Sequence, residues 1–508
     1  MRKKYYRLNS VFHFIGDLLS KFSLFLLLPL VVVFIFRHRA NEGRITLLAF
    51  LISSVVTFFF GLILKTIFKK NKIDGTASML ICGLSWIFIS AAGALPYIFI
   101  IKANILNAYF EAVSGFTTTG ITVFSGLDFM PPSLIFWRSL TQWIGGLGIL
   151  SLFIVIIYQS GAVHHIYSAE SHKISSSRPK PGLFNTLKVL WGIYLLYTFL
   201  AALLFSLVGM GVFDAINHAF TALSTGGFSP HDASIAYYAE NNYKHYKLIE
   251  YTVTFFMLLG GVNFLVHFRL LSGKIRALWD NTEMRLWWKL IAGFIILIMI
   301  DHLNRTGWIG RIFSGNLDNL WTKIESTFRY SIFQVISIIT TTGFGTRDIG
   351  GAFFPALAKQ LFLIMMVIGG CVGSTGGGIK VIRIAALKKL LSRELFKIWA
   401  PQSASKKLII DGNIVPDEEI HRISSLFFYW MFLLCVGGGL TALVTDLSGW
   451  QSFSGMFSAL GNIGPCYISV SEMINIHPVA KITYIFGMLL GRLEIIPVLL
   501  IFTKKAWK

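Results

Sequence analysis

The chain has 508 residues, of which 55% are hydrophobic and only 14% are charged, and apolar runs of about 18 or more residues recur along its whole length. This composition excludes a soluble protein, and no stretch between the runs is long enough for a separate soluble domain. The net charge of +21 does not require a nucleic-acid partner, because most Lys and Arg residues fall in segments that alternating spans place in the cytoplasm. We therefore expect a multi-pass membrane protein, surrounded by lipid, with both termini cytoplasmic.

The first two apolar runs predict a helical hairpin. Residues 11–36, interrupted by Pro29, and residues 45–68 are each long enough to cross a bilayer, and a short loop joins them. No threonine-glycine motif lies between them, so residues 1–72 form an N-terminal transmembrane hairpin outside the repeats that follow.

A short motif then recurs four times, each time between two longer apolar runs. Its copies are Thr118-Thr119-Gly120, Ser224-Thr225-Gly226, Thr341-Thr342-Gly343 and, more distantly, Asn462-Ile463-Gly464. Each copy follows an apolar segment of about two turns, far too short to cross a bilayer. Such a long, regular period indicates one unit used four times: spanning helix, half-helix, turn and spanning helix.

Two spans per repeat give successive repeats the same orientation, so an axis along the membrane normal should relate them. The predicted fold class is an all-α polytopic membrane protein with four parallel M1-P-M2 repeats (helix, pore half-helix, helix) and pseudo-four-fold symmetry around one ion pore. The predicted units after the hairpin are residues 73–180, 181–284, 285–410 and 411–508 for repeats one to four.

The second span of each repeat shows where the chain is interrupted. In repeats one, two and four we expect unbroken spans over residues 134–158, 249–271 and 479–502. In repeat three the run over residues 353–391 is far too long for one span and is broken at its centre. The break contains Gly373, Ser374, Thr375, Gly376, Gly377 and Gly378, and Lys380 follows it.

Glycine costs about 1 kcal/mol relative to Ala in a helix interior, so this break predicts an irregular loop partway across the membrane. One interpretation is a movable gate below the four turns, and the other is a static break that eases packing. A phosphate-binding loop is disfavoured because the stretch lacks the Gly-Lys-Ser/Thr ending.

Non-helical turns at membrane depth are tolerated only where protein buries them or where they line a water-filled cavity. Four converging turns place rings of backbone carbonyls around one axis, which is how a potassium-type filter replaces an ion's hydration shell. The half-helices aim their partly negative C-terminal ends at the same axis. We therefore expect K⁺, the transported ion, on the backbone carbonyls of the twelve motif residues, with no cofactor in this chain.

Arg492 is an ionisable residue inside the last span. Such residues usually face a cavity. In a cavity beneath the turns, the positive charge of Arg492 would repel cations and slow their passage; an ion pair with Glu494 is the alternative. Four acidic residues follow the motifs and either concentrate cations at an outer mouth or cap loops. They are Asp128, Asp232, Asp348 and Glu472.

The leading functional class is a gated K⁺ uptake pore. The alternative is a K⁺ symporter coupled to H⁺ or Na⁺, which would have broken helices in symmetric positions, whereas only repeat three is predicted to be broken. An enzyme is disfavoured because the chain has neither HExxH nor GxSxG.

These motifs resemble the Trk/Ktr/HKT superfamily of potassium transporters, and within it the bacterial TrkH branch, over nearly the whole chain. The resemblance rests on residues 114–120, 226–235, 340–344, 369–384, 462–465 and 491–494. It implies a homodimer in the bacterial inner membrane that conducts K⁺ inward. It also implies a cytosolic TrkA-like regulatory ring, so any nucleotide is expected on that partner subunit.

The resemblance also assigns roles to residues. It matches the glycines at 120, 226, 343 and 464 to the four filter glycines, residues 373–378 to the intramembrane gate, and Arg492 to the pore arginine. Some plant relatives with Na⁺ preference have serine at the first filter position, so glycine there implies K⁺. Ser224-Thr225 departs from the more apolar residues expected in the second filter.

Overall fold

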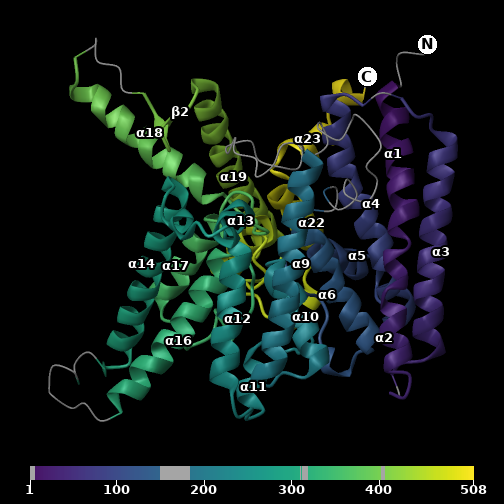
Figure 1. The fold of residues 1–508 in the computed structure, drawn as a ribbon, viewed down its shortest axis with the longest axis horizontal. Coiled ribbons are helices and arrows are strands. Elements are labelled where there is room, and N and C mark those ends of the chain that lie inside the picture. The colour runs from purple at the N-terminus through teal and green to yellow at the C-terminus, as the bar shows by residue number, and fades with distance from the viewer. Residues whose placement is uncertain are drawn as a thin grey trace.

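The computed structural model describes residues 6–39, 41–71, 73–148, 151, 183–308, 311, 319–401 and 407–507, and these residues are mostly helical (Figure 1). Six helices in them are long and apolar enough to cross a membrane, or seven if one bent pair counts as a span. The strands among them are β1 (Ile409–Ile410) and β2 (Asn413–Ile414), one small antiparallel pair. The predicted all-α membrane class is confirmed.

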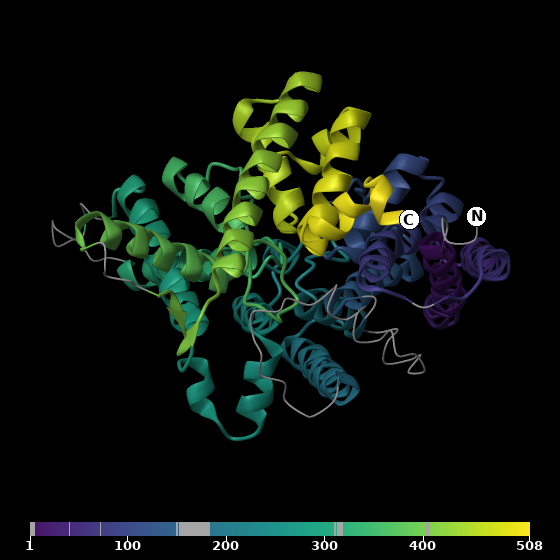
Figure 2. The same cartoon turned by 90° about the horizontal axis from the view of Figure 1, so that it is seen from above.

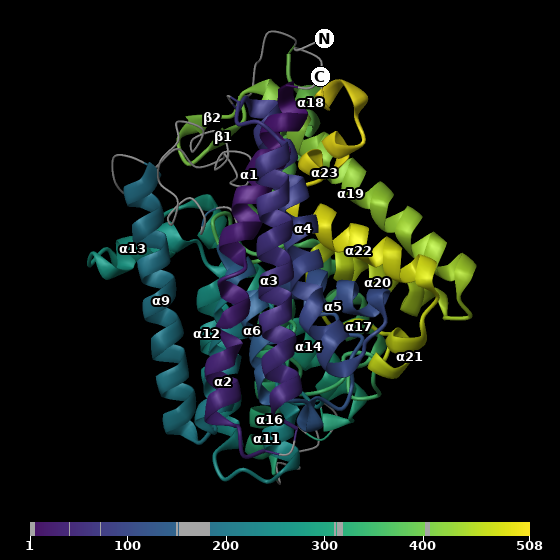
Figure 3. The same ribbon diagram turned by 90° about the vertical axis from the view of Figure 1, so that its right-hand side faces the viewer.

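The N-terminal hairpin lies at one edge of the molecule (Figures 1 and 3). It comprises α1 (Tyr6–Phe22), η1 (Phe25–Leu27), α2 (Pro29–Ile35) and α3 (Arg44–Ile67). Two glycines face each other in it: a Cβ on Gly16 would lie 2.6 Å from the carbonyl oxygen of Gly61. Small residues at such a contact let α1 and α3 approach closely, as they do in membrane helix pairs.

The remaining helices can be grouped into four sets that each contain one half-helix, and the third set begins with α14 at Thr282, before the predicted boundary at residue 285. Repeat one has α4 (Gly75–Ile101), α5 (Ile105–Phe116), η2 (Leu127–Phe129) and α6 (Pro132–Gly146). Repeat two has α9 (Leu183–Val208), α10 (Val212–Leu223), α11 (Ala236–Glu240), α12 (Tyr246–Gly261), α13 (Phe264–Leu271) and η3 (Ile275–Leu278). Repeat three has α14 (Thr282–Arg305), α16 (Leu320–Ile339), α17 (Ala356–Val367) and α18 (Val381–Trp399). Repeat four has α19 (Asp417–Val444), α20 (Gly449–Gly461), α21 (Val470–Asn475), α22 (Pro478–Leu493), α23 (Ile496–Ile501) and η4 (Lys504–Trp507).

The half-helices α5, α10, α16 and α20 are longer than the two turns predicted, at 12, 12, 20 and 13 residues. Their first turns are not continuously apolar, so the apolar run marked only their C-terminal parts. Side-chain caps fix two of the starts: Asn104 accepts a hydrogen bond from the Leu106 amide, and Ser448 accepts one from the Gln451 amide.

The second spans are interrupted in repeats two and four as well as in repeat three, so the prediction of a single broken repeat was wrong. Helix α12 meets α13 at a bend of 106°. In repeat four, α22 ends at Leu493, and the positive φ values of Glu494 and Ile495 separate it from α23. In repeat one, α6 ends at Gly146, and most of the span predicted beyond it lies outside the described residues.

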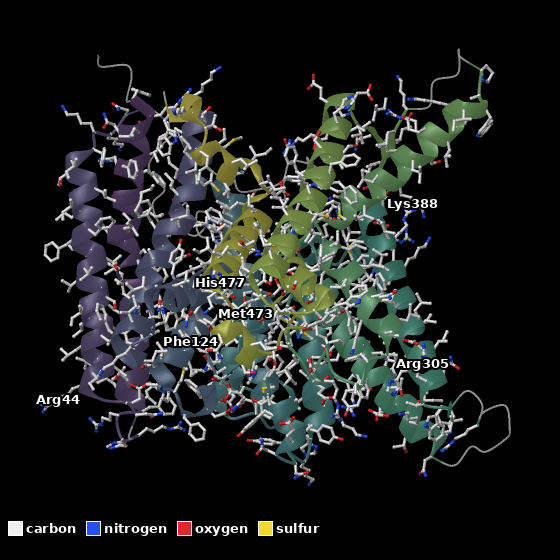
Figure 4. All side chains as sticks on the ribbon, turned by 180° about the vertical axis from the view of Figure 1, so that it is seen from behind. Arg44, Phe124, Arg305, Lys388, Met473 and His477 are labelled. Atoms are coloured by element: carbon white, nitrogen blue, oxygen red, sulfur yellow. The ribbon has the colours of Figure 1, made fainter. Side chains whose placement is uncertain are left out.

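The ends of the molecule can be located in the figures. Both chain termini lie at one end in Figure 1, and the rings of Phe12 and Trp507 stack there at a centroid distance of 6.2 Å. In Figure 4, Lys388 of α18 lies toward that end, and Arg44 and Arg305 lie toward the other. The helices between these charged residues form the apolar, membrane-spanning part.

Candidate ion pathway

Four glycine turns follow the half-helices and share one backbone conformation. In each turn a residue with positive φ is followed two positions later by a glycine with positive φ. The pairs are Thr118 and Gly120, Thr225 and Gly227, Thr341 and Gly343, and Asn462 and Gly464. A left-handed threonine costs roughly 1 kcal/mol or more, so the surrounding structure must hold these turns firmly.

The half-helices themselves hold the turns. In turn one, the amides of Thr119 and Gly120 both donate to the carbonyl oxygen of Ser114, at 2.9 and 3.4 Å. The corresponding amides of turns two and three donate in the same way to Thr221 and Ser337. Each of these turns is therefore anchored to the backbone of its own helix.

This geometry corrects the register of the second turn. Ser224 is the C-cap of α10, as Thr117 and Thr340 are the C-caps of α5 and α16. The glycine equivalent to Gly120 is therefore Gly227, one residue later than the alignment of the four motifs within the sequence predicted. The predicted set Ser224, Thr225 and Gly226 becomes residues 225–227. The sequence motif was aligned one residue too early because Ser224-Thr225-Gly226 resembles Thr118-Thr119-Gly120 in residue type. The position where α10 ends determines which glycine has positive φ.

The four turns close into a ring. A Cβ on Gly120 would lie 2.2 Å from the carbonyl oxygen of Gly226, and one on Gly227 would lie 2.0 Å from that of Thr342. The same relation holds from Gly343 to Ile463, at 2.1 Å, and from Gly464 back to Thr119, at 2.9 Å. Each glycine thus lies against a carbonyl of the next repeat, and only glycine fits there. Figure 2 shows the four repeats from above.

Residues 368–380, the repeat-three loop, form the irregular segment predicted between α17 and α18. Ile368 and Ile379 pair as a parallel bridge, and the Gly369 amide donates to the Ile379 carbonyl at 2.9 Å. The loop packs directly against turns two, three and four, and a Cβ on Gly377 would lie 2.8 Å from the Cβ of Asn462 in turn four. The Gly377 amide donates to the hydroxyl of Thr341 at 2.8 Å, and the hydroxyls of Thr225 and Thr375 lie 3.2 Å apart.

Two cationic side chains hold the repeat-three loop. The Lys380 ammonium donates to the carbonyl oxygens of Gly376 and Gly377. The Arg492 guanidinium donates to Thr375 at 2.6 Å, and on the opposite side to Gly145 and Gly146, each also at 2.6 Å. Arg492 therefore connects repeat four, the loop and repeat one.

The ion-pair alternative for Arg492 involved Glu494. That carboxylate pairs with Arg383 of α18 at 2.6 Å. The guanidinium of Arg492 donates to backbone carbonyls of Thr375, Gly145 and Gly146, and its position beside the ion pathway stays a prediction.

Among the acidic residues after the turns, Asp232, Asp348 and Glu472 accept hydrogen bonds from loop or helix-start amides, one of the two roles considered. Asp232 accepts from the amides of Gly126 and Leu127, and Asp348 accepts from that of Gly350. Glu472 forms a capping box with Ser469. Asp128 bonds to His231, a residue to which the sequence analysis assigned no role.

His231 connects the outer loops of repeats one and two. Its Nδ1 lies 2.5 Å from Asp128 and its Nε2 lies 3.1 Å from Asp214. Burial disfavours the charged ring, but the hydrogen bonds to both carboxylates outweigh it and raise the pKa of His231 above its usual value. The ring also stacks on Tyr237 at a centroid distance of 3.5 Å.

Two buried ion pairs behind the turns were also missed. Glu111 and Arg138 pair at 2.8 Å with almost no exposure, and Arg138 also donates to the Ser229 carbonyl beyond turn two. Glu250 pairs with Arg329. Charged residues inside apolar segments were the available signal, because such residues are retained where they have a partner. The described residues contain no group of three or more His, Cys, Asp and Glu side chains able to hold a metal ion.

Spanning helices around a closed ring of glycine turns, with an arginine among backbone carbonyls beneath them, define a membrane cation transporter. Comparison with known proteins agrees. Residues 47–507 match the TrkH family model, described as a cation transport protein. The chain belongs to this family of cation transporters, which are not enzymes.

Individual relatives cover almost the whole chain. It is 35% identical, over 98% of its length and 99% of the relative's, to the Trk system potassium uptake protein TrkH of Salmonella typhimurium. It is 30% identical to the protein of the same name from Halomonas elongata, over 99% of both chains. The crystal structure of the potassium transporter TrkH from Vibrio parahaemolyticus superposes with a TM-score of 0.83 at 30% identity, covering 99% of this chain and 100% of that one.

Proposed function

We propose that this protein takes up potassium across the bacterial cytoplasmic membrane through the ring of glycine turns. The observation that carries the proposal is the ring itself, in which each glycine lies against a carbonyl oxygen of the next repeat. Carbonyl oxygens held in this way replace the hydration shell of K⁺. The relatives named as potassium uptake proteins support the same ion. The ligands are the carbonyls of residues 118–120, 225–227, 341–343 and 462–464.

The repeat-three loop serves as the gate in this proposal. It lies against turns two and three, and Arg492 and Lys380 hold it through backbone carbonyls. Moving α18 or α23 would move Arg383 and Glu494, which pair next to Arg492. A cytosolic TrkA-like ring with bound nucleotide is the proposed source of that movement. The transporter itself works as a homodimer with both termini in the cytoplasm.

Coupling of K⁺ to H⁺ or Na⁺ is the second candidate. The interrupted second spans of repeats two, three and four favour it, because symmetric breaks are typical of alternating-access transporters. The closed ring favours the pore, since a filter that surrounds one axis requires no exchange of access.

Flux into liposomes tests both proposals. Purified protein is reconstituted, and K⁺ and Na⁺ entry are measured under a set membrane potential without a pH or Na⁺ gradient. Potential-driven K⁺ entry that exceeds Na⁺ entry supports the pore. Entry that needs a proton or sodium gradient overturns it in favour of coupling. Gly120→Ser should raise Na⁺ entry relative to K⁺, and an unchanged ratio in active protein contradicts the filter assignment.

A further inference from the structure

The second span of repeat one differs from the other three second spans at one buried position. Each second span contains a glycine pair or its counterpart, Gly-Gly in three repeats and Gly-Arg in the fourth, and one residue lies three positions before it. These four residues are fully buried, and three of them are methionines: Gln142, Met257, Met366 and Met488. Repeat one alone places a polar side chain at this position.

The Gln142 amide holds the second turn at two points. Its Nε2 donates to the carbonyl oxygen of Gly226 at 2.7 Å, and its Oε1 accepts from the Phe228 amide at 3.0 Å. These contacts lie on either side of Gly227, the glycine with positive φ. One side chain from repeat one therefore brackets the filter turn of repeat two.

The same side chain explains why residue 226 is glycine. Its equivalents in the other turns are Thr119, Thr342 and Ile463. Gly226 does not have positive φ, so its backbone does not require glycine. A Cβ there would lie 2.3 Å from Cδ and 2.4 Å from Oε1 of Gln142. The Gln142 amide occupies the space that a side chain takes in the other turns.

We infer that Gln142 is a positioning residue that sets ion selectivity at the second glycine turn. The inference rests on the proposed K⁺ uptake. The Gly226 carbonyl belongs to the ring, because it faces Gly120. Selectivity depends on the number, orientation and field strength of the carbonyl dipoles. The Gln142 donor fixes one of these carbonyls and keeps it from moving inward onto a smaller ion such as Na⁺.

Gln142→Met tests the positioning role, because it places the residue of the other repeats at this position and removes only the polar group. Losing a net hydrogen bond should lower the K⁺/Na⁺ permeability ratio about fivefold. Met257→Leu is the matched control at the same position of repeat two and should keep the ratio. Wild-type protein without K⁺ preference overturns the proposed function. A selective wild type with an unchanged Gln142→Met ratio overturns this inference alone.

A second pair of variants tests the shared space, and it decides the matter if Gln142→Met does not fold. Gly226→Thr alone collides with Gln142 and should abolish K⁺ uptake. Combining Gly226→Thr with Gln142→Ala frees the space and should raise uptake at least about tenfold above the single variant, which corresponds to relief of roughly 1.4 kcal/mol. A double variant as inactive as the single variant contradicts the inference.

Discussion

The ring of glycine turns and the repeat-three loop are both rich in glycine, but they are held in different ways. Amides in turns one to three donate to the backbone of their own half-helix, so these turns can move only if their helices unwind. The loop is held by groups of other elements: backbone carbonyls at the end of α12, the hydroxyl of Thr341 and the guanidinium of Arg492. In the proposed gate, a shift of those elements would release the loop without unfolding it. Under the proposed function, fixed selectivity and movable gating thus depend on which groups hold the glycines.

Gly227→Ala should have the largest effect, because it changes the ring of glycine turns, the part that the half-helices hold in place. The new Cβ would lie 2.0 Å from the Thr342 carbonyl at a φ of 77°, which combines a collision with a strained backbone. We expect K⁺ uptake into liposomes to fall more than about 100-fold. Gly192→Ala on α9, where a Cβ meets no atom within 4 Å, is the control. Normal K⁺ uptake by Gly227→Ala would contradict this assignment and favour Gly226 as the equivalent of Gly120.

Arg492→Ala should act in the opposite direction, because it releases the movable part. Three charge-assisted hydrogen bonds to the loop and to repeat one disappear. Basal K⁺ flux without a regulatory partner should rise at least about tenfold. The K⁺/Na⁺ ratio should stay constant, since the ring is untouched. A folded but silent variant would show that Arg492 supports the pathway instead of closing it.

Lys380→Met should give a smaller rise in basal flux, a few-fold at most, because this cation bonds only to carbonyls within the loop. Met approximates the length of the side chain and removes the donor. The measurement is the same flux assay, with Lys388→Met on α18 as a control outside the loop. A change in ion ratio instead of flux would contradict the division between fixed ring and movable loop.

The smallest effect concerns the outer loops, where His231 bonds to Asp128 and Asp214. Its raised pKa means that the charged ring stabilises the fold fully below about pH 6.5, the usual histidine value, and that this stability is lost as pH rises through the folded pKa. The melting temperature of His231→Gln should therefore lie below that of the wild type at pH 6 and approach it at pH 9. A constant difference across this range would assign the effect to stacking on Tyr237.

Much of the fold was readable from the sequence because spanning helices and repeated glycine motifs leave strong local patterns. The breaks after α12 and α22 were not predicted, since two leucines just before Gly260 and before Gly491 continue the apolar run. The register of turn two depends on the residue at which α10 ends, and the residue types of the motif alone do not determine that residue. The Glu111–Arg138 pair and the Gln142 contact join different elements, so only the folded chain brings their partners together.

The ring closes within a single polypeptide, from Gly464 back to Thr119. In a channel made of four identical subunits, every substitution appears on all four sides of the ion at once. Here each side has its own codons, so mutation alters one side and leaves the other three as they are. Each side of the ring can therefore differ from the others, and the contact between Gln142 and Gly226 is found on one side only.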